Sequence, residues 1–216
     1  EVQKVGGDLT LQTLGVISVD TVGGNVIYKD LTGAFEIKRV GGELEGFNAG
    51  DISAYFVGGE ADLSGVLGKV QLSAGGDVRL QFNAPQIMES RVKAGGDIEL
   101  SVPENASANL SLQSGGEEIT VHACGQELDV EKESYDLPLG QGGAVVQLIA
   151  GGDVAVREGK ESVNQYSSVF EDLGDTWRDF GHEIEEKVRR SMRGVNQSLR
   201  QAGWEASNAM REATDK

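Results

Sequence analysis

Pairs of adjacent glycines recur at nearly constant spacing, and this repeat constrains the fold more than any other feature of the sequence. The pairs begin at Gly6, Gly23, Gly41, Gly58, Gly75, Gly95, Gly115 and Gly151. The first six spacings are 17, 18, 17, 17, 20 and 20 residues, and the last is 36, twice 18. A further pair, Gly142-Gly143, falls off this register. A fixed period of this length predicts stacked units that bury their apolar faces against their neighbours.

Apolar residues alternate with other residues after each glycine pair, a pattern typical of β-strands. The residues two places after the pairs form one row: Leu9, Val26, Leu44, Ala61, Val78, Ile98, Val145 and Val154. A second row follows two residues later: Leu11, Tyr28, Leu63, Leu80, Leu100 and Val156. Half a repeat further on, the same alternation follows single glycines: Gly15, Gly33, Gly50 and Gly68. We therefore expect two short strands in each repeat.

These repeats predict an all-β fold, a β-solenoid of about nine coils, each of about 17 to 20 residues and hydrogen-bonded to the coils above and below it. Glycine suits the corners because it adopts positive φ without steric cost and lets stacked backbones approach closely. The extra residue in Glu117-Glu118 predicts a bulge. Residues 83–85 and 103–106 lengthen their coils and are expected to form loops.

The composition changes after Gly159. Only four of the 31 glycines lie beyond Lys160, and apolar residues there follow a spacing of three and four. This spacing predicts an amphipathic α-helical appendage over residues 160–216, next to a β-solenoid over residues 1–159. The apolar stripe supplies the candidate interaction residues: Phe170, Leu173, Trp177, Phe180, Ile184, Val188, Met192, Leu199 and Trp204.

Three locations for this stripe stay open. In the first, the stripe covers an open end or flank of its own solenoid, where unpaired backbone groups of the edge strands would invite aggregation. Alternatively it pairs with the same helix of a second subunit, or it lies on a membrane surface, which the tryptophans and arginines suit.

Charge and cysteine content exclude several classes of protein. The formal net charge of -16 argues against nucleic acid as a partner. The single cysteine, Cys124, forms no internal disulfide and no thiolate metal cage. No window approaches 18 apolar residues, and the sequence opens at Glu1 without an apolar signal core. We expect a soluble mature or excised fragment.

Candidates for catalysis are weak. His122 and Cys124 lie two residues apart on one predicted strand and so face one side, as a thiolate-imidazole pair requires. We favour a different role for Cys124, that of a small buried apolar residue. His182 lacks the second histidine of a metalloprotease motif. We expect no catalytic residue and no cofactor.

Acidic and amide residues occupy equivalent corners after the glycine pairs. They are Asp8, Asn25, Glu43, Glu60, Asp77, Asp97 and Asp153. Stacked like charges repel, so a row of bound cations such as calcium is one hypothesis. The glycine and aspartate nonapeptide of calcium-binding β-rolls is absent from these repeats. We favour solvated turn residues and expect no metal.

The repeated Val-Gly-Gly-Asp-Leu units, and residues 96–103 followed by Asn105-Ala106, carry a resemblance to a known family. Over about residues 1–157 the chain resembles the bacterial adhesin-like β-solenoids also called toast-rack domains, a domain family of unknown function. The resemblance implies a right-handed single-chain β-helix in a bacterial envelope or surface setting, with some relatives tied to membrane-stress sensing. It transfers no catalytic residues.

Together these features predict a non-enzymatic extracellular or cell-envelope scaffold, adhesin-like, which binds copies of itself or a surface ligand. Self-association into a homo-oligomer or filament is expected through the solenoid ends, with Glu1 to Lys4 adding to a neighbour's sheet, or through the helical tail. The alternative is a membrane-stress sensor that binds lipid or peptide. An enzyme acting on polysaccharide is the third hypothesis.

Overall fold

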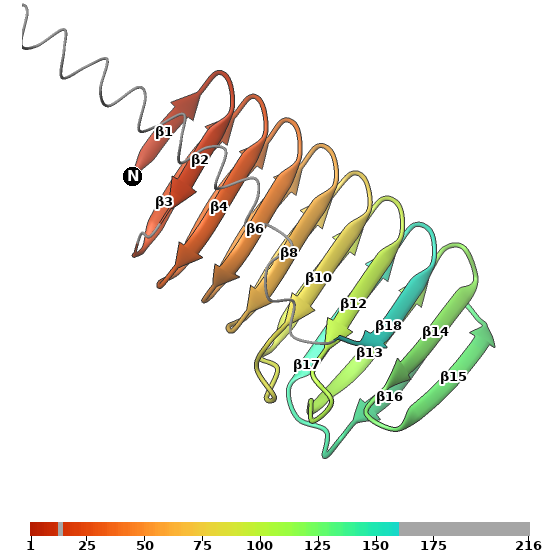
Figure 1. The fold of residues 1–216 in the computed structure, drawn as a ribbon. Helices are drawn as coiled ribbons and strands as arrows, with labels where there is room; N and C mark the ends of the chain where they lie inside the picture. The colour runs from red at the N-terminus through yellow and green to blue at the C-terminus, as the bar shows by residue number, and fades with distance from the viewer. Residues whose placement is uncertain (13–14, 160–216) are drawn as a thin grey trace, which may run out of the picture. The chain divides into compact units, whose positions relative to one another are not determined.

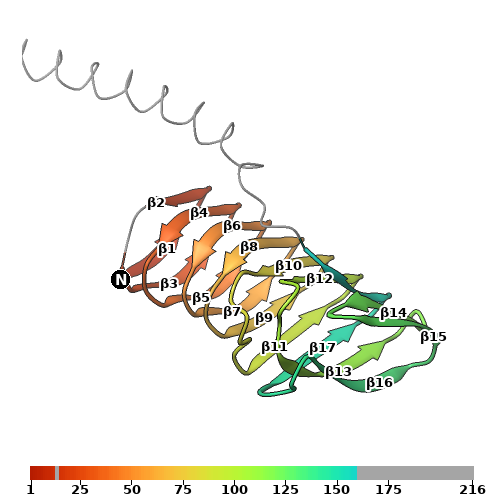
Figure 2. The same cartoon turned by 60° about the horizontal axis from the view of Figure 1, so that its bottom comes forward.

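From the N-terminus to the fourteenth strand, successive strands alternate between two facing β-sheets (Figures 1 and 2). The computed structural model describes residues 1–12 and 15–159, and these contain strands, turns and loops but no helix. The predicted appendage over residues 160–216, with its boundary at residue 159, lies outside the described residues.

The described residues form two sheets of nine strands each. In spatial order, sheet A contains β1 (Val2–Val5), β3 (Ile17–Val22), β5 (Phe35–Val40), β7 (Ile52–Val57), β9 (Val70–Ala74), β11 (Ser90–Ala94), β17 (Val145–Ala150), β13 (Ala108–Ser114) and β16 (Ser134–Leu139). Sheet B contains β2 (Leu9–Gln12), β4 (Val26–Leu31), β6 (Leu44–Ala49), β8 (Ala61–Val66), β10 (Val78–Phe82), β12 (Ile98–Val102), β18 (Val154–Glu158), β14 (Glu118–Ala123) and β15 (Gln126–Glu131).

Parallel pairing follows the sequence repeat. From β1 to β10, each strand pairs in parallel with the strand two places further along the chain. We call a sheet A strand and the sheet B strand that follows it a layer. The prediction of two strands per repeat is confirmed, and residues 17 to 20 positions apart become partners, such as Val26 with Leu44 and Val78 with Ile98.

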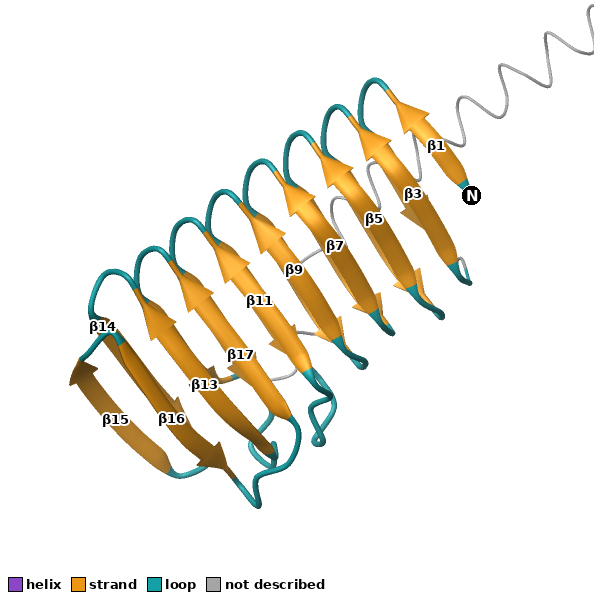
Figure 3. Cartoon of the chain, turned by 180° about the vertical axis from the view of Figure 1, so that it is seen from behind, coloured by secondary structure: helices purple, strands orange, loops and turns teal. Residues whose placement is uncertain are grey.

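The order of the layers departs from the expectation near the C-terminal end of the described chain. Strands β17 and β18 insert between the layers β11/β12 and β13/β14, as Figure 3 shows for β17. The step of 36 residues from Gly115 to Gly151 is therefore not two coils in sequence. It contains the strands β15 and β16, which pair antiparallel with β14 and β13.

This insertion corrects one member of the predicted apolar row. Val145 lies in sheet A opposite Asn109 and is 50% exposed, whereas the rest of the row lies in sheet B. The pair Gly142-Gly143 belongs to the loop between β16 and β17. The off-register glycine pair was a sign that Val145 starts a strand of the other sheet.

The core lies between the two sheets, where alternate residues of each strand point inward. The second apolar row forms a continuous ladder in sheet B, in which Leu11, Tyr28, Gly46, Leu63, Leu80 and Leu100 are successive partners. Tyr28 is fully buried, and its ring packs against Phe35 at 5.2 Å between centroids. Its hydroxyl has no hydrogen-bond partner among the described residues, and burial, followed by the charge of Asp62, raises the pKa of this phenol.

Gly46 gives the Tyr28 ring its space. A Cβ atom at Gly46 would overlap the Tyr28 ring atoms. The ladder therefore alternates its largest and its smallest side chain at neighbouring positions, as close packing requires.

The corner glycines are explained by close approach alone, which corrects half of the prediction. The glycines of the repeated pairs do not have positive φ. Instead, a Cβ at the first glycine of a pair would meet the carbonyl oxygen of the equivalent glycine in the neighbouring layer, as at Gly75, where the oxygen of Gly58 would lie 2.6 Å away. Stacked corners thus exclude any side chain on this side of the backbone.

Positive φ occurs instead at one position of the longer sheet B strands. Asp30, Asn48 and Gly65 have φ of 54°, 53° and 73°, and they belong to the neighbouring strands β4, β6 and β8. Asn48 Nδ2 donates a hydrogen bond to Asp30 Oδ1 over 2.9 Å. Glycine, asparagine and aspartate are the residue types that adopt left-handed backbone most readily, which explains their occurrence at this position of the repeat.

The predicted bulge and loops are confirmed. Glu117 has a φ of 68° and takes up the extra residue, after which Ile119 pairs with Val154. Residues 83–85 lie in the loop from β10 to β11, and residues 103–106 lie in the loop from β12 to β13. These two loops contact each other, because the Ser107 amide donates to the Pro85 carbonyl over 2.8 Å.

Candidate functional site: the two ends of the strand stack

The end formed by β1 and β2 is an open edge among the described residues. Strand β1 pairs with β3 alone and β2 with β4 alone. Three inward side chains of this layer are apolar and only half buried, namely Val2, Val5 and Leu9, whereas the fourth, Leu11, is buried. An edge of this kind is a template for adding another strand.

The hydrogen-bond pattern shows which backbone groups point away from the stack. The Leu9 amide donates to the Asn25 carbonyl, and the Val5 carbonyl accepts from the Gly23 amide, each over 2.9 Å. In a parallel ladder, consecutive residues bond to opposite neighbours. Lys4 and Thr10 therefore direct their amide and carbonyl groups outward.

The opposite end is closed by the antiparallel strands β15 and β16 (Figure 1). Exposed acids alternate along β15 at Glu127, Asp129 and Glu131. Strand β16 contains Pro138, which has no amide hydrogen and is tolerated in sheets at edges facing solvent. Charge and proline are the devices by which proteins prevent strand addition. The two ends of the stack therefore differ in what they can bind.

The residues selected from the apolar stripe cannot be compared with this site. Phe170 to Trp204, with the three locations weighed for their helix, lie outside the described residues. The sequence-based candidate that the structure does place is the segment Glu1 to Lys4, most of which forms the edge strand β1.

The thiolate-imidazole hypothesis is wrong in its geometry. Cys124 lies in the turn after β14, with a φ of 52°, so it does not share a strand face with His122. Its Sγ lies 3.6 Å from the carbonyl oxygens of Pro103 and Ala106. Burial raises the pKa of the Cys124 thiol, which disfavours the thiolate.

Four members of the acidic corner row, Asp8, Asn25, Asp77 and Asp97, accept hydrogen bonds from backbone amides of the next layer. Asp8 Oδ1 accepts from the Asn25 amide over 2.8 Å, and Asp97 Oδ1 accepts from the Asp153 amide over 2.8 Å. The same bond joins Asp77 to the Asp97 amide over 2.9 Å. The row ends at Asp153, whose Oδ1 is buried without a partner among the described residues, next to the bulge at Glu117.

Replacing Asp97 with alanine is expected to lower the free energy of unfolding by about 1 kcal/mol, because the Asp153 amide loses its acceptor. Asp97→Asn is the matched control and should cost little, since Asn25 fills the same role and accepts from the Glu43 amide. Urea unfolding monitored by circular dichroism measures both changes. Equal losses for the two variants would show that the charge, not the hydrogen bond, stabilises the corner.

The described residues contain neither a cluster of metal ligands nor a membrane-spanning helix. Within residues 1–12 and 15–159, no three His, Cys, Asp or Glu side chains gather as a metal site would require. The described part of the chain has no helical segment with the length and hydropathy needed to span a bilayer.

Compared with protein-family models, curated proteins and solved structures, the chain gives no significant match. The resemblance to toast-rack domains stays a prediction.

Proposed function

We propose that the chain is a non-enzymatic β-solenoid scaffold of the cell envelope or extracellular surface that self-associates through the open edge of β1 and β2. The observation that carries the proposal is the difference in surface chemistry between the β1/β2 end and the β15/β16 end of the stack. One end presents outward backbone groups and half-buried valines, and the other presents acids and a proline.

The solenoid is the interpretation that best accounts for the alternation of strands between the sheets. A strand of sheet A, a strand of sheet B and the return to sheet A make one coil, and the return strand pairs in parallel with the first. Parallel crossovers in proteins are almost always right-handed, so we propose a right-handed solenoid.

Unlike ends favour a closed dimer over the filament expected from the sequence. Growth head to tail would bring the open edge of one copy against the acidic cap of the next. A two-fold axis perpendicular to the sheets instead places β1 of two copies side by side and antiparallel, so that like edges satisfy each other's outward groups. Such an interface is isologous, and the only sheet edges it leaves among the described residues are β15 and β16, which acids and proline protect.

The test is the mass of the full chain by size-exclusion chromatography with light scattering. We expect a dimer for the wild type and a monomer for the double variant Lys4→Pro/Thr10→Pro, which removes two outward donors without removing a bond within the stack. Circular dichroism of the variant checks that its strands persist.

Two control variants locate the interface. Glu127→Ala/Asp129→Ala changes the capped end and should leave the dimer intact. Trp177→Ser/Ile184→Ser changes the apolar stripe of the tail and should also leave it intact. A monomeric wild type would overturn the proposal. A dimer that survives the prolines but not the tail variant would move the interface to the tail, and long filaments would overturn the closed geometry.

A further inference from the structure

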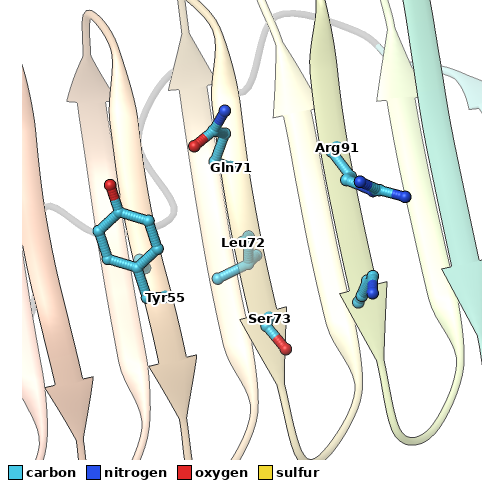
Figure 4. A pocket seen from close by; sticks show the side chains of 7 residues that line it. Tyr55, Gln71, Leu72, Ser73 and Arg91 are labelled. Atoms are coloured by element: carbon cyan, nitrogen blue, oxygen red, sulfur yellow. The ribbon is translucent and has the colours of Figure 1, made fainter.

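The outer face of sheet A carries a depression of about 390 Å³ over the middle strands β7, β9 and β11. Figure 4 shows Tyr55 on one side of it, Gln71 and Ser73 on the central strand and Arg91 on the other side. Lys93 completes the polar lining. The depression lies far from the edge strands β1 and β2, so an inference from it stands independently of self-association.

A change in strand length creates the depression. Strand β7 has six residues and exposes two in succession, Tyr55 and Phe56, whereas β9 has five and presents only Ser73 there. The register between the two strands shifts between Ala54 and Val57. Two aromatic rings thus stand beside a serine, and the sheet surface steps down.

The walls are held at fixed spacing by the strand ladder. Gln71 pairs with Arg91 and Ser73 pairs with Lys93 across β9 and β11. Neighbouring strands lie about 4.8 Å apart, so Tyr55 and Lys93, two strands apart, stand roughly 10 Å apart at the backbone. On the aromatic side, the Arg39 guanidinium lies 4.8 Å from the centroid of the Phe56 ring, while Tyr55 stays 53% exposed.

The two cations of the depression are unpaired among residues 1–12 and 15–159, in a chain whose net charge is -16. Three other cations on the sheets form ion pairs: Lys38 with Asp20, Arg79 with Glu60 and Arg157 with Glu99. Arg91 and Lys93 have neither an ion pair nor a hydrogen bond to any described residue. Their neighbours on β17, Gln147 and Ile149, are uncharged.

We propose that this depression binds a sugar residue bearing a carboxylate, as in an acidic polysaccharide of uronic acids. An exposed tyrosine ring offers its electron-rich face to the apolar C–H face of a sugar. Arg91 and Lys93 supply charge-assisted hydrogen bonds to the carboxylate. Gln71 and Ser73, between them, donate to and accept from hydroxyls. The spacing of about 10 Å accommodates one or two sugar units.

Other anionic ligands fit less well. Nucleic acid and anionic lipid surfaces require many cations to offset repulsion from a chain of net charge -16, and the depression has two. An acidic peptide would use the cations but has no apolar ring face for Tyr55. The ring and the polar strand between ring and cations together favour the sugar.

Isothermal titration calorimetry of the full chain with a hexamer of galacturonic acid tests the proposal at low ionic strength. We expect binding that weakens at least about tenfold in Tyr55→Ala and in Arg91→Gln/Lys93→Gln. The matched control is Arg79→Gln, which removes an exposed cation from the outer face of sheet B and should leave binding unchanged. A neutral glucose hexamer should not bind.

Three results would overturn the proposal. The first is no detectable heat with galacturonate up to about 10 mM. The second is an equal loss in Arg79→Gln, which would show diffuse charge attraction. The third is binding of hexaglutamate as tight as that of the sugar, which would show a site for acidic peptides. Circular dichroism establishes that each variant keeps its strands, which the exposed positions favour.

Discussion

Valine at position 46 is expected to lower the free energy of unfolding by about 4 kcal/mol, the largest effect of any single substitution considered for this chain. The Gly46 backbone passes directly beside the fully buried ring of Tyr28, so a branched side chain there has no space. Phe35 of the facing sheet packs against the ring and limits its movement away from Gly46. Thermal unfolding should show a midpoint lower by roughly 10 °C.

The partner residue supplies the control. In a Tyr28→Ala background, Gly46→Val should cost far less, because the valine fills the space that the ring vacates. In a Tyr28→Phe background it should cost as much as in the wild type, since the ring remains. Tyr28→Phe alone should stabilise the fold by about 1 kcal/mol, because it removes a buried hydroxyl without a partner among the described residues. Strictly additive losses at positions 28 and 46 would contradict the packing argument.

Alanine at the corner glycine Gly75 is expected to cost about 3 kcal/mol. The added methyl would lie against the carbonyl oxygen of Gly58, and both belong to backbone that other layers hold in place. Relief requires two layers to move apart, which lengthens the hydrogen bonds between them. Urea unfolding of the variant measures the loss.

Gly6→Ala is the matched control for this prediction. Gly6 is the first glycine of its pair, like Gly75, but it lies in the end layer and a Cβ there meets nothing within 4 Å. Alanine at this position should be neutral or slightly stabilising, because it restricts the unfolded chain. The comparison is made on protein dilute enough to be monomeric. Similar losses at positions 6 and 75 would mean that the glycines serve backbone conformation and not close approach.

The sequence repeat predicted the layers well because the same period governs the corners, the strands and the core. Glycine spacing, alternation and the apolar rows each depend on neighbouring layers, so the pairing of Val26 with Leu44 follows from counting residues. The sequence does not indicate that the layer of β17 and β18 lies between the layers β11/β12 and β13/β14. Gly95, Gly115 and Gly151 begin chemically equivalent corners, and any of them can stack on any other.

The surface sites were harder to predict than the core. Arg91 and Lys93 alternate with buried residues, so their outward direction was readable, but the shift between β7 and β9 that puts Tyr55 beside them was not. That shift depends on one residue of strand length. The acidic corners show the reverse case, where a row that suggested cations serves backbone amides.

The insertion of β17 and β18 fixes the order in which the chain matures on the ribosome. Strands β13 to β16 are synthesised before the layer that separates them from β11 and β12 exists. Strands β13 and β14 can pair with β16 and β15, but their other edges either wait unpaired or pair first with β11 and β12 and later part to admit the new strands. Completion of the stack is postponed until residue 158 has emerged, so a nascent chain arrested after β16 exposes strand edges that the finished protein conceals.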